Sequence, residues 1–89
     1  MGDDHPELLT FPCRITVKAL GRQSPALLDT VLRIATRHYP ELDPAGVMVR
    51  PSAKHRYASI NIRVRADSRR QIDALYHDLS ACDQILMLL

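Results

Sequence analysis

Residues 50–66 constrain the fold more than any other part of the chain. From residue 58 onward, apolar side chains occupy every second position and polar or charged side chains fill the positions between them. The apolar set is Ala58, Ile60, Ile62, Val64 and Ala66, and the intervening set is Ser59, Asn61, Arg63 and Arg65. Successive side chains of a strand point to opposite sides, so this pattern predicts one long strand with an apolar face and a solvent-exposed face.

Three further segments are predicted to be strands. Residues 13–20 alternate in the same way, and Gly21 is expected to end that strand and free the backbone for a tight exit. Residues 47–51 end in a proline, which suits an edge strand because a missing N–H costs least there. Residues 85–89 are apolar at every position and are expected to form a last strand that is apolar on both faces.

Two segments show helical spacing of apolar residues. The first begins at Ser24-Pro25, an N-cap hydroxyl followed by proline at the first helical position, and Pro40 stops it at Tyr39. The second begins at Ser68, where Gln71 completes a predicted capping box. The expected buried stripes are Leu27, Leu28, Val31, Leu32, Ala35 and His38 or Tyr39 in the first helix, and Ile72, Leu75, Tyr76, Leu79 and Cys82 in the second.

The order of elements is therefore strand, helix, strand, strand, helix, strand. With right-handed crossovers, this βαββαβ order predicts an α+β ferredoxin-like plait, a four-stranded antiparallel sheet of order 4-1-3-2 with both helices on one face. Residues 11–89 are expected to form one such domain. Residues 1–10 are acidic and polar, and we interpret them as a flexible arm that docks through Leu8 and Leu9.

Composition excludes several classes of protein. A hydrophobic content of 46% and a charged content of 25% are typical of a globular domain. The longest apolar run, residues 85–89, is far shorter than the roughly 20 residues that a membrane-spanning helix needs. Acidic residues (Asp3, Asp4 and Glu7) occupy the place where a signal peptide would be positively charged, so a cytoplasmic location without membrane contact is expected.

No set of residues predicts metal, cofactor or catalytic chemistry. The histidines and cysteines lack the spacing of metal ligands: His5, His38, His55, His77, Cys13 and Cys82. Ser52 and Ser59 lie near Lys54 and His55, but no carboxylate accompanies them as an orienting group. We therefore expect no enzyme, and we interpret Ser52 as a residue that stabilises a turn.

The solvent-exposed face of the predicted sheet has one sign of charge. It carries Arg14, Thr16, Lys18, Met48, Arg50, Ser59, Asn61, Arg63 and Arg65, with Lys54 and Arg56 at the adjoining turn. A face with cations and no carboxylate attracts anions, which predicts a protein partner or a small anionic effector. The alternative is a simply solvated face whose charges are screened by salt. Nucleic acid is less favoured, because Tyr57 is the one aromatic residue placed to stack a base.

The last predicted strand suggests a second surface. One apolar side of residues 84–89 would lie on the outside of a lone domain, and such a strand is an aggregation hazard unless it is covered. Its cover would be the N-terminal arm, another protein, or a second copy of the chain in a homodimer.

Several motifs together resemble the YbeD-like family of small bacterial proteins, over residues 10–89. They are Phe11-Pro12, Gly21, Pro25-Ala-Leu-Leu-Asp-Thr-Val, Arg50-Pro-Ser-Ala-Lys, Tyr57-x-Ser59-Ile-x-Ile and Leu75-Tyr76-x-x-Leu79. The Pro51-Ser52-x-Lys54 turn is the most specific of these. Where many members have glycine after that lysine, this chain has His55.

The resemblance implies a plait similar to ACT regulatory domains and brings no established activity. Members tend to be encoded near enzymes of lipoate synthesis, which implies a regulatory role there. Gly21, Ser24 and Pro25 look like the bend where ACT domains hold small effectors, usually at a dimer interface, although Arg22-Gln23-Ser24 replaces the Asp and second Gly of that bend. The sequence thus predicts a non-enzymatic binding module with two candidate sites, the basic face with its turn (Arg14, Lys18, Arg50, Ser52, Lys54, Tyr57, Ser59, Arg63, Arg65) and this bend.

Overall fold

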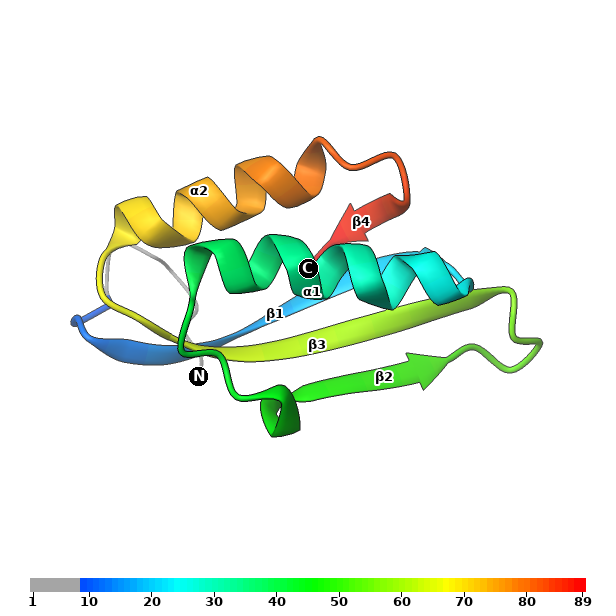
Figure 1. Cartoon of the computed structure of the whole chain (residues 1–89), viewed down its shortest axis with the longest axis horizontal. Coiled ribbons are helices and arrows are strands. Elements are labelled where there is room, and N and C mark those ends of the chain that lie inside the picture. Colours follow the sequence, from blue (N-terminus) through cyan, green and yellow to red (C-terminus); the bar gives the residue numbers. More distant parts are fainter. Residues whose placement is uncertain (1–8) are drawn as a thin grey trace.

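The computed structural model describes residues 9–89 and forms one layer of sheet covered on one side by two helices (Figure 1). Its elements are β1 (Cys13–Arg22), α1 (Pro25–His38), η2 (Pro44–Gly46), β2 (Val47–Pro51), β3 (Tyr57–Ala66), α2 (Arg69–Ser80) and β4 (Ile85–Leu88). The strands are antiparallel in the order β2-β3-β1-β4. The predicted βαββαβ plait and its strand order are therefore confirmed.

The two central strands fix the alternation of the sheet. β1 and β3 pair over their whole lengths, from Cys13 opposite Ala66 to Arg22 opposite Tyr57. This register places the apolar positions of both strands on the side of the helices. The largest fully buried side chains come from both layers: Leu27, Ile60, Ile62, Leu75, Leu79, Val17 and Val31.

Both helix starts follow the predicted capping chemistry. The Ser24 hydroxyl accepts a hydrogen bond from the Leu27 N–H at 3.2 Å, and the Ser68 hydroxyl accepts one from the Gln71 N–H at 3.2 Å. The capping box is only half formed, because the Gln71 side chain accepts from the Asp67 N–H instead of the Ser68 N–H. The predicted stripe of α2 is also one residue too long, since the helix ends at Ser80 and Cys82 lies beyond it.

Gly21 does not end the first strand, as the sequence had suggested. β1 continues to Arg22, and its register with β4 shifts between Leu20 and Gly21. A Cβ atom added at Gly21 would collide with the Gln84 carbonyl oxygen and lie 2.6 Å from Leu27 Cδ1. Glycine is needed here because β4 and α1 approach the strand closely, not because the chain turns.

The N-terminal arm was predicted over residues 1–10, and residues 1–8 lie outside the described part of the chain. Leu9 packs against the core just before the start of β1, whereas β4 pairs with the last part of β1. Leu9 is therefore not the cover of β4. Across residues 9–89, no helix combines the length and the apolar character that crossing a membrane requires.

Candidate functional site

The side of the sheet away from the helices, which we call the outer face, is strongly basic. Alternation along the paired strands places six exposed cations on it: Arg14, Lys18 and Arg22 from β1, Arg50 from β2, and Arg63 and Arg65 from β3. None of the four strands contains Asp or Glu. The outer face therefore carries one sign of charge.

Three arginines are brought together at one end of this face. Arg14 lies directly opposite Arg65, and Arg63 lies opposite Thr16. β2 and β4 pair only with more distant parts of the central strands, so this end is a two-stranded ribbon. Like charges directly opposite one another destabilise a sheet, so the Arg14–Arg65 pair is unfavourable in the isolated chain. A bound anion would relieve that repulsion.

The acidic residues of residues 9–89 form their ion pairs elsewhere, on the helices. Asp29 contacts Arg33 at 2.7 Å, Asp73 contacts Arg69 at 3.8 Å, and Asp78 contacts both His38 and Arg37. The cations of the outer face take part in none of these pairs. Their field therefore extends into solvent, within the screening length set by salt.

The other end of the outer face meets the turn between β2 and β3. Ser52 closes this turn, since its N–H donates to the Tyr57 carbonyl at 2.8 Å and its hydroxyl accepts from the Tyr57 N–H at 3.2 Å. The predicted turn-stabilising role of Ser52 is thus confirmed. His55 has φ 57°, a left-handed backbone conformation that favours glycine. This agrees with the glycine that many members of the YbeD-like family have at this position. Lys54 is exposed at the tip of the turn.

Sequence reasoning missed Arg22 as part of the basic face. The structure pairs Arg22 with Tyr57, which is 41% exposed, and pairs Arg50 with Ser59. The signal was present, because the alternation of β1 continues through Gly21 to Arg22. Arg22 was left out of the basic face because the predicted strand ended at Gly21.

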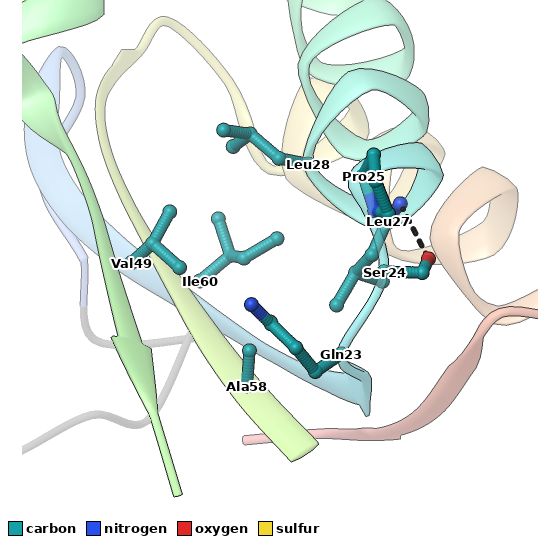
Figure 2. A pocket seen from close by; sticks show the side chains of 8 residues that line it. All are labelled: Gln23, Ser24, Pro25, Leu27, Leu28, Val49, Ala58 and Ile60. Carbon is teal, nitrogen blue, oxygen red and sulfur yellow. Dashed lines mark hydrogen bonds between the residues drawn. The ribbon is translucent and has the colours of Figure 1, made fainter. Parts of the chain in front are cut away.

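The structure separates the residues of the predicted effector bend: Ser24 and Pro25 lie in one place and Gly21 in another. Ser24 and Pro25 line a largely apolar pocket of about 350 Å³ between α1 and strands β2 and β3, whereas Gly21 packs against β4 and α1 instead. The other lining residues are Gln23, Leu27, Leu28, Val49, Ala58 and Ile60 (Figure 2). Figure 2 shows the Gln23 side chain reaching in toward Ile60, while the Ser24 hydroxyl is engaged by the Leu27 N–H. Val49 lines this pocket and remains 42% exposed.

A polar contact joins the two helices on the other side of the molecule. His38 Nε2 lies 2.6 Å from Asp78 Oδ2, and this hydrogen bond holds the pKa of Asp78 below its ordinary value. The Gln71 side chain donates to the His38 carbonyl at 3.0 Å. Burial raises the pKa of the neighbouring Tyr39 to about 12. Within residues 9–89 no three His, Cys, Asp or Glu side chains cluster as metal ligands would.

Comparison with known proteins finds a matching family and bacterial relatives of the chain. The family described as "Protein of unknown function (DUF493)" matches residues 6–89. A UPF0250 protein of Vibrio vulnificus (strain YJ016) is 40% identical over 84 residues, covering 93% of this chain and 88% of the relative. A UPF0250 protein of Sodalis glossinidius (strain morsitans) is 38% identical and covers 93% of each chain.

Two solved structures share the fold at low sequence identity. A protein from H. pylori matches with a TM-score of 0.71 and 10% identity, covering 100% of this chain and 98% of that one. The ACT domain from GTP pyrophosphokinase of Chlorobium tepidum matches with a TM-score of 0.67 and 8% identity, covering 86% of this chain and 83% of that one. The ACT-like fold and the resemblance to the YbeD-like family are thereby confirmed.

Proposed function

We propose that this chain, which belongs to the DUF493 family of proteins of unknown function, is a cytoplasmic, non-enzymatic binding module of regulatory type. Its working surface in this proposal is the basic outer face, which recognises an acidic protein partner or a small anion. The observation that carries the proposal is the set of six exposed cations on strands without a single carboxylate.

The chemistry of these cations favours carboxylates or phosphates as the recognised groups. Five of the six are arginines, whose planar guanidinium group binds such anions through two parallel hydrogen bonds. Tyr57 is the one aromatic side chain on the four strands, which supports contact with acidic groups over stacking of nucleic-acid bases. The hydroxyl of Ser52, one of the two candidate nucleophiles of the sequence, accepts a hydrogen bond from the Tyr57 N–H within the turn.

An amide chemical-shift titration of the labelled protein tests this function. The panel contains oligo-glutamate, inorganic phosphate, lipoate, octanoate, free amino acids and a short single-stranded oligonucleotide. Lipoate and octanoate test the regulatory link to lipoate synthesis that the family resemblance implies. We expect oligo-glutamate or phosphate to shift the amides of Arg14, Lys18, Arg63 and Arg65. If saturating oligo-glutamate and phosphate both leave the amide shifts of the outer face unchanged, the proposal is refuted.

A second candidate function is sensing of a small effector in the pocket beside α1. The pocket of about 350 Å³ supports it, because the size suits one small molecule and Gln23 supplies an amide among apolar walls. The ACT-like fold also supports a dimer, for which the exposed apolar residues at the end of the chain are the proposed contact: Leu86 and Met87 in β4, and Leu89 after it. Shifts at Gln23 and Val49 with an amino acid would favour this candidate. A sedimentation profile that stays monomeric at high concentration would count against it.

A further inference from the structure

The outer face is not uniformly basic, because apolar side chains line its β4 side. We call Leu20, Leu86, Met87 and Leu89 the apolar border. Leu20 lies opposite Met87 across the β1–β4 pair, and the Leu89 N–H donates to the Lys18 carbonyl at 2.9 Å. Leu86, Met87 and Leu89 are 49%, 52% and 62% exposed. An apolar strip of this kind at a charged surface is typical of a protein-binding site.

The apolar border and the cations have the dimensions of one helix. Two strand spacings separate β4 from β3 across β1, or roughly 10 Å, which is the diameter of an α-helix with its side chains. From Leu20 to Arg14 the strand rises about 20 Å, the length of about 13 helical residues. A helix laid along β1 would therefore contact the border near Leu20 at one end and reach Arg63 and Arg65 at the other end.

We propose that the anionic partner is an acidic amphipathic helix of another protein, whose leucine-type residues pack on the apolar border and whose carboxylates pair with Lys18, Arg14, Arg63 and Arg65. This inference rests on the proposed function and specifies its partner. The helix-in-groove mode of recognition uses apolar anchors at positions i, i+3, i+4 and i+7, which form one such strip.

The charges and the strand geometry disfavour the other occupants of this surface. A second copy stacked face to face would bring the two sets of six cations together. An added strand would meet β4, which is four residues long and shows a register shift where it joins Gly21, so it is a poor template. Nucleic acid or a free small anion would neutralise the cations but leave the apolar border in water.

Three peptides separate these cases in a binding titration against the full chain. The first is about 18 residues long, with Leu along one side of the helix and Glu on the other. The second has the same composition in scrambled order, and the third is oligo-glutamate of equal charge. We expect the first peptide to bind at least about tenfold more tightly than the other two, with shifts on both the border and the arginine end.

Two methionine variants test whether the apolar border contributes to the affinity for the amphipathic peptide. Met87→Ser removes an exposed side chain from the border, whereas Met48→Ser removes one that is 62% exposed on the opposite edge of the same face. We expect Met87→Ser to abolish most of the advantage of the amphipathic peptide, and Met48→Ser to leave it unchanged.

The remaining outcomes distinguish failure of this inference from failure of the proposed function. Equal binding of all three peptides, insensitive to Met87→Ser, would overturn the inference and leave an anion-binding face. No binding by any anion would overturn both. A dimer in sedimentation that Met87→Ser dissociates would show that a second copy covers the border. If an oligonucleotide of equal charge binds more tightly than the peptides, the outer face is a nucleic-acid-binding surface and the inference is overturned.

Discussion

The two faces of β3 are built from one alternating sequence and have opposite properties. Ile60 and Ile62 are 0% exposed beneath the helices, while Arg63 and Arg65 project from the other side of the same strand. The inner face is determined by packing, because each apolar side chain must fit its neighbours. The outer face contributes little packing and even opposes two arginines directly. This contrast indicates that folding depends on the inner face, and it leaves the outer face available for the binding that we propose.

The largest expected effect is on the inner face. Ile62→Ala removes a fully buried side chain at the centre of the sheet, and we expect it to lower the free energy of unfolding by about 3–4 kcal/mol in urea denaturation. Arg63→Ala, the next residue but on the outer face, is the matched control and should change that free energy by less than about 0.5 kcal/mol. Similar losses for both variants would break the distinction between the faces.

The second effect concerns Gly21, which sequence reasoning had assigned to an effector site. Gly21→Ala should lower the free energy of unfolding by about 2–3 kcal/mol, because the new Cβ has no room between Gln84 and Leu27. Gly46→Ala is the control, since its Cβ would lie 3.4 Å from the Arg63 carbonyl oxygen and meet only ordinary contacts. If Gly21→Ala is as stable as the wild type, the chain around Gln84 does not approach Gly21 as closely as described.

A third, smaller effect should have the opposite sign. Arg65→Glu places a carboxylate opposite Arg14, so we expect the free energy of unfolding to rise by up to about 1 kcal/mol at low salt. Arg65→Lys keeps the like-charged pair and should leave stability nearly unchanged. A marked loss of stability in Arg65→Glu would mean that the outer face does contribute to folding through Arg65.

The smallest effect belongs to neither face of the sheet but to the contact between the helices. The pKa of Asp78 is lowered in the folded protein by the hydrogen bond with His38. Its stabilisation is therefore present above the ordinary pKa of 3.8 and is lost as the pH falls through the lower folded value. Thermal melts should show Asp78→Asn below the wild type at neutral pH, with the difference closing in acid. A constant difference across that range would contradict this assignment.

The fold was predictable from the sequence because its information is local and periodic. The alternation of β3, the Ser24-Pro25 start of α1 and the Ser68 cap each specify one element, and the element order then selects the plait. Gly21 was misjudged because glycine serves turns and close approaches alike, and only the positions of Gln84 and Leu27 distinguish the two.

The candidate site was predictable only in part. Alternation identified five of the six cations on the outer face, and the apolar run of residues 85–89 predicted an exposed apolar side of the last strand. Arg22 was missed because the predicted strand ended at Gly21. That the apolar side of the last strand lies beside the cations could not be predicted, since Leu20 meets Met87 only through the β1–β4 register. The pocket beside α1 likewise brings together residues far apart in the sequence, such as Leu28 and Val49, and no local pattern encodes that.

The central claim is that binding depends on the outer face and not on net charge, and one affinity comparison tests it most directly. The double variant Arg63→Glu with Arg65→Glu and the double variant Arg69→Glu with Arg70→Glu change the net charge equally. The second pair lies at the N-terminus of α2, where Glu is well tolerated. We predict that the first variant loses at least about tenfold in affinity for oligo-glutamate, or about 1.4 kcal/mol, while the second stays near the wild type. Equal losses in both variants would contradict the account.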